Sequence, residues 1–191
     1  MWLSLDTDLQ YRFDGDIAPV AFFEHLRLLL ASTDTLVLGC YDARPDIRQY
    51  LAAAALPPDW HRFNFTETWD INRAEHPDGA AFHLRADSGT LHQLIQFAGS
   101  VTQHIELCDH IAAYSAEHPL IIYHGTFREP LFVSSRIPSS SVEAFSQAIG
   151  VPFEVIDFPK TYFPATSLHN ELTGSSILCN ESPTDRRFFR G

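Results

Sequence analysis

Lysine is almost absent from this chain of 191 residues, in which only Lys160 is a lysine and the other basic residues are arginines. The 13 basic residues are outnumbered by 24 acidic ones, so the formal net charge is −11. Proteins bind nucleic acids mainly by neutralising phosphates with basic side chains. The charge therefore disfavours DNA and RNA as ligands, and it is consistent either with simple solubility or with a basic partner.

Cysteine is scarce as well, and long apolar runs are missing. Cys40, Cys108 and Cys179 are widely spaced and lack the paired spacing of zinc sites, which fits a reducing compartment. No run of about 18 apolar residues suggests a membrane span. The N-terminal MWLSLDTDLQ has neither the basic start nor the apolar core of a signal peptide. We therefore expect a cytoplasmic protein with no membrane partner.

The glycine-rich motifs that bind phosphates are also missing. Nine glycines are spread through the chain, and neither GxGxxG nor GxxxxGK[ST] occurs among them. There is likewise no GxSxG, no HExxH and no recognisable catalytic-cysteine motif. We expect no nucleotide or other cofactor.

What the chain does contain is a large stock of rigid apolar side chains, with 15 Phe, 6 Tyr and 3 Trp against a single Met. A chain of this length and composition can bury one normal core, so we expect a single domain over residues 1–158. From Pro159 onward, Pro, Ser, Thr and Asn dominate, and the last residues are basic and aromatic. Residues 159–191 are therefore expected to form a C-terminal extension that is partly irregular.

Hydrophobic periodicity predicts the elements of the domain. Strands are expected at residues 2–14, 35–41, 60–66, 81–85 and 153–158, and three more within 105–137. Helices are expected to begin at the N-caps Asp16, Asp42, Ser88 and Ser140, the last in a capping box with Glu143. They are expected to end near Ala31, Pro57, Gly99 and Gly150.

The order of these elements favours an α+β fold. Strands and helices mix without strict alternation, and residues 105–137 predict three successive antiparallel strands, a meander in the C-terminal half. We expect a mixed sheet of about five to seven strands with about four helices. A doubly wound α/β sheet is the alternative. Residues 35–41 form a continuous apolar run of strand length, so we expect them to be a central strand covered on both faces.

The meander also holds the densest group of chemically capable side chains. If its first strand begins at Glu106, then Glu106, Cys108, His110 and Tyr114 share one face. A turn over residues 115–118 would pair Tyr114 with Pro119 and set Asp109 opposite His124. A carboxylate in that position can orient an imidazole and raise its pKa.

Three kinds of site could be built from this part of the chain. One is a Cys108 nucleophile with a histidine base, one is a metal site of His110, His124 and a carboxylate, and one is a serine nucleophile at Ser134 or Ser135. The more economical interpretation is a core cysteine with hydrogen-bonded strand histidines. A small hydrolase or metal-dependent enzyme that uses Cys108, Asp109, His110 and His124 is therefore the second hypothesis for function.

The first hypothesis is a protein without its own catalysis that binds a basic protein partner. Aromatic residues in or beside predicted loops, together with acidic neighbours, are typical of protein interfaces. The candidate contact residues are Trp60, Trp69, Asp78, Phe127 and Glu129. An immunity protein or an antitoxin-like inhibitor suits this pattern, because an acidic surface can occupy the cationic site of a toxin. A structural or assembly subunit is the third hypothesis.

Overall fold

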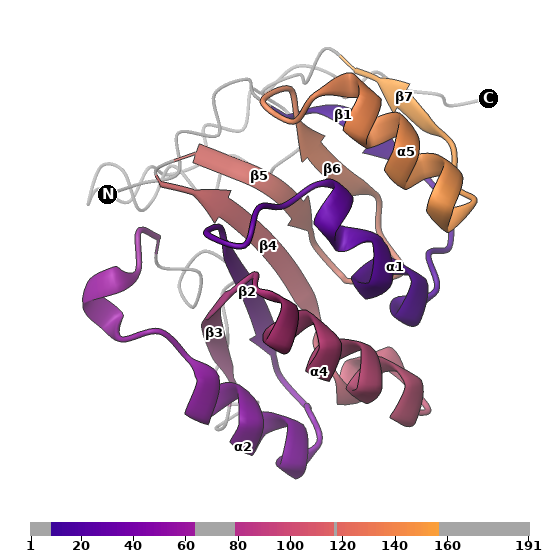
Figure 1. Cartoon of the computed structure of the whole chain (residues 1–191). Coiled ribbons are helices and arrows are strands. Elements are labelled where there is room, and N and C mark those ends of the chain that lie inside the picture. Colours follow the sequence, from indigo (N-terminus) through magenta and orange to yellow (C-terminus); the bar gives the residue numbers. More distant parts are fainter. Residues whose placement is uncertain (1–8, 64–78, 117, 157–191) are drawn as a thin grey trace, which may run out of the picture.

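One antiparallel sheet with helices on one of its faces forms the described part of the molecule (Figure 1). The computed structural model of the chain describes residues 9–63, 79–116 and 118–156. The strands are β1 (Leu9–Phe13), β2 (Thr35–Cys40), β3 (Ala80–Arg85), β4 (His110–Ser115), β5 (His118–Tyr123), β6 (Leu131–Ser134) and β7 (Phe153–Val155). The α-helices are α1 (Pro19–His25), α2 (Pro45–Ala54), α4 (Ser88–Ser100) and α5 (Ser139–Ile149). The 3-10 helices are η1 (Leu26–Leu28), η2 (Pro58–Trp60) and η3 (His104–Glu106).

The strand order is β3-β2-β4-β5-β6-β1-β7, and each pairing between these strands is antiparallel. This confirms the α+β class, and the adjacent β4, β5 and β6 confirm the meander. The expected mixture of strand directions is wrong for the described strands. The reason lies in the helical connections, because α4 joins two parallel strands, β3 and β4, between which β2 is inserted. The same is true of α5, which joins β6 to β7 across β1.

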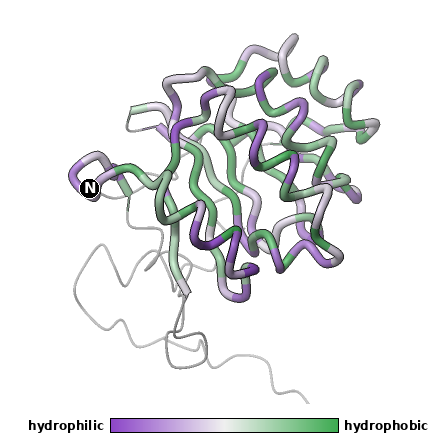
Figure 2. Tube along the Cα trace, turned by 60° about the horizontal axis from the view of Figure 1, so that its bottom comes forward, coloured by the Kyte–Doolittle hydropathy of each residue, from purple (hydrophilic) through white to green (hydrophobic). Residues whose placement is uncertain are grey.

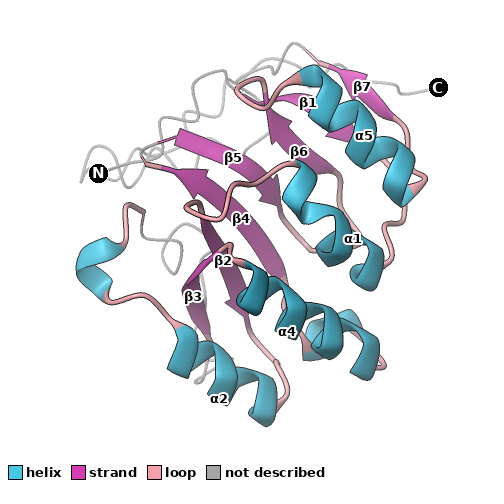
Figure 3. Cartoon of the chain, viewed as in Figure 1, coloured by secondary structure: helices cyan, strands magenta, loops and turns pink. Residues whose placement is uncertain are grey.

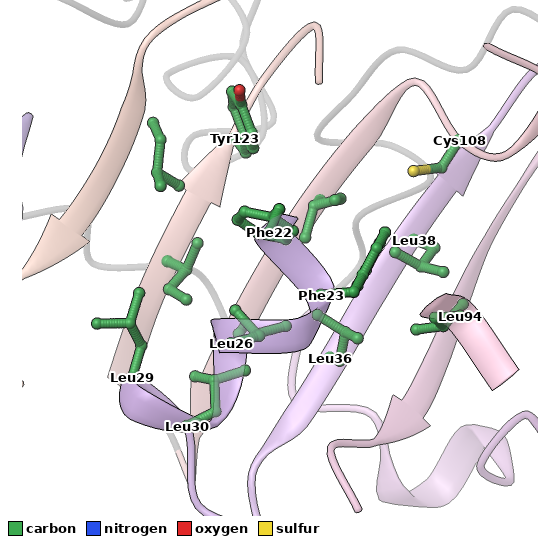
Figure 4. Packing of buried hydrophobic residues seen from close by; sticks show 14 of the residues in the cluster. Phe22, Phe23, Leu26, Leu29, Leu30, Leu36, Leu38, Leu94, Cys108 and Tyr123 are labelled. Atoms are coloured by element: carbon green, nitrogen blue, oxygen red, sulfur yellow. The ribbon is translucent and has the colours of Figure 1, made fainter. Parts of the chain in front are cut away.

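The main core lies between the sheet and the helices, which cover the same face (Figure 3). Each residue of β2 is buried, as expected for a strand covered on both faces. Phe22 and Phe23 of α1 pack on Leu36 and Leu38 of β2 and on the β5 side chain of Tyr123 (Figure 4). Figure 2 shows the same arrangement as hydrophobic strands in the interior and hydrophilic residues mainly on the helices and connections.

The other face of the sheet holds a smaller buried cluster that includes a histidine, and we call it the histidine face. It is the side that carries Val37, His83, Ala112 and Tyr114. The side chain of Phe63 packs on it against Tyr114, with ring centroids 4.9 Å apart. Residues that follow the α2–η2 connection therefore cross this face of the sheet.

Three of the four predicted N-caps are replaced by residues without a capping side chain. The N-caps of α1, α2 and α5 are Ala18, Arg44 and Pro138. In α1 and α2 a proline follows at the first helical position, where its fixed φ suits the helix and its missing N–H costs nothing. Asp16, Asp42 and Ser140 were therefore wrong as caps.

The fourth helix, α4, begins at Ser88, but its N-cap is Asp87, whose side chain accepts a hydrogen bond from the Thr90 N–H at 2.9 Å. Gly99 lies inside this helix rather than after it. The predicted stop at Gly150 is confirmed, because this residue has a left-handed backbone at the end of α5.

The strand expected at residues 60–66 is not formed in the part of this range that is described. Trp60 closes η2, and residues 61–63 follow as an irregular segment, while residues 64–66 lie outside the described residues. The period of two nevertheless identified a real feature, because His61 and Phe63 both turn toward the sheet. No helix in the described ranges is long and apolar enough to cross a membrane.

Candidate functional site

The predicted site lies where β2 and β5 end and β4 begins, and its geometry depends on one irregularity in the β4–β5 hairpin. At the turn, Tyr114 pairs with Pro119 as expected. Leu120 is then an extra residue of β5, because the next pair is Ala113 with Ile121. Proline has no N–H for the ladder and is found at bulges, so Pro119 explains the shift. The register moves by one residue along the rest of the hairpin.

The shift sets His110, and not Asp109, across from His124. The two imidazoles stack with centroids 4.3 Å apart and planes inclined by 13°. The Nδ1 atom of His110 accepts the Gly125 N–H at 3.0 Å, so the neutral ring carries its proton on Nε2. That Nε2 lies 3.2 Å from the Tyr41 hydroxyl, to which it donates. Burial and, less strongly, His124 lower the pKa of His110 to about 3.

Asp109 ties β2 to the turn after β5 and does not lie across from His124. Its carboxylate accepts the Tyr41 N–H at 2.7 Å, and its own N–H donates to the Gly39 carbonyl at 2.8 Å. Its carbonyl accepts the Thr126 N–H at 2.6 Å. The expected pairing of Asp109 with His124 is therefore wrong, because it assumed a hairpin without a bulge.

Cys108 lies in the main core and not beside His110. It precedes β4, it is fully buried, and it packs with the helix-facing residues (Figure 4). Glu106, expected on the same strand face, lies in η3. Burial, together with the nearby Cys40 and Asp109, raises the pKa of the Cys108 thiol well above its ordinary value. Since the thiolate is the nucleophile, this environment suits a structural cysteine.

The other residues considered for chemistry are also accounted for. Ser134 is buried on β6, and its hydroxyl accepts the Arg136 N–H at 3.2 Å, while Ser135 is exposed. In the ranges that the structure describes, no group of three His, Cys, Asp or Glu side chains is arranged to hold a metal ion.

A second stacked histidine pair, which the sequence did not reveal, lies on the histidine face. The rings of His61 and His83 are 3.8 Å apart and inclined by 11°. The Nδ1 atom of His83 is hydrogen-bonded to the Tyr114 hydroxyl at 3.0 Å. The two residues are 22 positions apart, and the alternating pattern predicts a strand for the segment that holds His61, so no sequence signal joins them.

The predicted contact residues differ widely in their exposure. The Trp60 side chain is 51% exposed, and the Arg85 guanidinium carbon lies 4.9 Å from the centre of its ring. Glu129 is also exposed. Phe127, in contrast, is buried against Tyr123 and the α1 side chains, so it was wrong as a surface contact. Trp69 and Asp78 lie outside the described residues.

Comparison with known proteins places no further constraint on this site. Models of protein families, curated proteins and solved structures were all searched, and none of them matches the chain. Function is therefore inferred from the residues and contacts described above.

Proposed function

We propose that this protein works by binding another protein with a basic surface, in the manner of an immunity protein or an antitoxin-like inhibitor. The observation that carries the proposal is Trp60, an exposed ring that is held in place by Arg85. Tryptophan and arginine are enriched among the residues that dominate binding energy. A side chain that is fixed before binding also loses less conformational freedom on association.

The charge of the chain supports a basic partner. Asp59 is exposed beside Trp60. Between residues 59 and 78 the sequence holds five acidic residues and two arginines, namely Asp59, Glu67, Asp70, Glu75, Asp78, Arg62 and Arg73. The net charge of −11 would attract a basic protein over a distance and speed the encounter, and Trp60 would then supply close contact.

An enzymatic function is supported less well, because the residues it would use already serve the fold. The Cys108 thiol is buried with a raised pKa, and the Asp109 carboxylate accepts a backbone N–H. His110 is neutral and hydrogen-bonded through both ring nitrogens. The free thiols of Cys40 and Cys108 fit a reducing compartment, and we place the protein in the cytoplasm.

The first partners to test are the products of the neighbouring genes, because an immunity protein is normally encoded beside its toxin. Binding of each purified product to the full chain is measured by titration calorimetry at about 50 and 300 mM salt. We expect binding that weakens with salt, and a loss of about tenfold or more in affinity for Trp60→Ala. Leu28→Ala is the matched control, since Leu28 is also an exposed apolar residue but lies in η1.

Two results would contradict the proposal. One is a partner whose affinity responds neither to salt nor to reversal of the charge on Asp59. The other is a partner that binds Trp60→Ala and Leu28→Ala equally well, which would place the interface elsewhere. Affinity capture from lysate, with Trp60→Ala as the comparison, extends the search beyond neighbouring genes.

A further inference from the structure

Trp60 belongs to a short segment, residues 60–63, that lies across β3 and β4. Three successive contacts hold this segment, and each uses a ring. Trp60 lies on Arg85, His61 stacks on His83, and the Phe63 ring meets Tyr114 edge-on. Arg85 and His83 are two residues apart on β3, so they present their side chains on the same side of the sheet. The His61–His83 stack is the middle contact of the three.

Hydrogen bonds reinforce this stack from both sides. The Tyr114 hydroxyl is bonded to His83 Nδ1 and also accepts the backbone N–H of Arg62. On the other side, Nε2 of His61 lies 2.9 Å from the Leu56 carbonyl, which can only accept, so this nitrogen carries the proton. Leu56 in turn donates its N–H to the His83 carbonyl at 2.7 Å. The neutral state of both rings satisfies every one of these bonds.

Two cationic side chains of the described residues lie near the stack. Arg62 and Arg85 lie close enough to Tyr114 to affect its titration, and both are cationic. The Tyr114 hydroxyl, which is bonded to His83, and the nearby Thr35 hydroxyl are both neutral. Protonation of both imidazoles would place like charges on two rings whose centroids are only 3.8 Å apart.

We propose that His61 and His83 form an acid-sensitive clasp, which holds Trp60 in its binding position near neutral pH and releases it when the pH falls. The clasp regulates the surface assigned above, so its effect on a partner rests on the proposed function. The opening of the clasp is a property of the isolated chain and does not depend on a partner.

The direction of the switch follows from the difference between the closed and the open states. Burial, and to a smaller extent His61, lowers the pKa of His83 to about 3 in the closed state. A histidine released to water titrates near its ordinary value of about 6.5. Below about pH 6.5, each pH unit therefore favours the open state by up to tenfold for such a histidine. Trp60 is held above this pH and released below it.

The test follows Trp60 in a full chain in which it is the one tryptophan, made with Trp2→Phe and Trp69→Phe. Its emission and its quenching by acrylamide are recorded from pH 8 to pH 4, with far-UV circular dichroism in parallel. We expect Trp60 to become more accessible between about pH 6.5 and 4 while the circular dichroism stays constant.

The decisive variant is His61→Phe with His83→Phe, which keeps two aromatic rings that can stack and removes both imidazoles. It is expected to abolish the transition, whereas His92→Phe, at an exposed position of α4, is expected to leave it unchanged. Should the double variant not fold, Tyr114→Phe provides the second test. It removes the hydroxyl that holds Arg62 and His83, so it is expected to raise the midpoint of the transition.

Three results would overturn the clasp. They are a constant Trp60 signal down to pH 4, a Trp60 change that coincides with global unfolding, and a transition that persists unaltered in the double variant. Partner binding is a separate measurement, in which the affinity should fall at about pH 5 for the wild type but not for the double variant. A failed search for a partner would weaken the proposed function and leave the pH titration of Trp60 fully interpretable.

Discussion

Gly125 shows at the scale of a single residue how the turn after β5 is built. It has a φ of 58°, a backbone conformation that residues other than glycine rarely adopt. Its N–H is the donor that fixes the tautomer of His110. An added Cβ would also lie 2.7 Å from Cγ of Glu129, so that side chain would have to move. Two separate costs therefore oppose any substitution at this position.

We expect Gly125→Ala to lower the free energy of unfolding by roughly 2 kcal/mol, as measured by urea denaturation. Gly150→Ala is the matched control, because Gly150 also has a positive φ, of 72°, but its Cβ would meet nothing within 4 Å. In the control, the free energy of unfolding should therefore fall only by the backbone contribution, about 1 kcal/mol. Equal losses for the two variants would show that the contact with Glu129 relaxes freely.

At the scale of elements, α4 illustrates how a cap is chosen. Asp87 and Ser88 are both good capping residues, and the sequence favoured Ser88. In the structure Asp87 takes the extended backbone of an N-cap, and its carboxylate accepts the Thr90 N–H. The carboxylate also interacts favourably with the positive end of the helix dipole. Only one of two adjacent residues can adopt the capping geometry, and backbone direction after β3 decides which.

The corresponding prediction is that Asp87→Ala destabilises the protein by about 1 kcal/mol in thermal or urea unfolding. Ser88→Ala is expected to change the stability by less than about 0.5 kcal/mol, because Ser88 is an exposed residue of the first turn. A larger loss for Ser88→Ala than for Asp87→Ala would contradict the observed cap.

At the scale of the whole molecule, two buried histidines predict how stability depends on pH. His83 and His110 each have a pKa lowered to about 3 in the folded state, mainly by burial. Above about pH 6.5 they are neutral in both states and cost nothing. Below that pH the unfolded chain binds a proton at each of these histidines, whereas the folded chain does not as long as the ring stays buried. Stability is therefore complete above about pH 6.5 and is lost as the pH falls toward the folded pKa.

Urea unfolding at successive pH values between 7.5 and 4.5 measures this loss, which should approach roughly 1.4 kcal/mol per pH unit for each histidine that stays buried in the folded chain. Once the clasp has opened, that histidine is His110 alone. The slope should become shallower for His110→Gln, even though that variant is less stable at pH 7.5. His92→Gln, on the surface of α4, should keep the slope of the wild type. A stability that stays constant down to pH 5 would contradict the neutral, buried state of these rings.

The sequence by itself determined the helices, most of the strands and the meander, because each of these depends on apolar spacing within one segment. The stop at Gly150 and the buried β2 were predicted correctly for the same reason, since local backbone preference and a continuous apolar run are visible in the chain. The acidity was also visible there, whereas the exposure of Trp60 was not.

Only the tertiary structure decided which side chains meet. Leu120 is one extra residue in β5, and it shifts the register so that His110, and not Asp109, is the neighbour of His124. Because side chains alternate along a strand, a shift of one residue changes which side chains meet. The sheet order separates strands that the helices connect. The segment that follows η2 folds onto the sheet and brings His61 onto His83. Register and long-range pairing depend on the packing of the whole sheet. They therefore decide the site, while local sequence decides the elements that carry it.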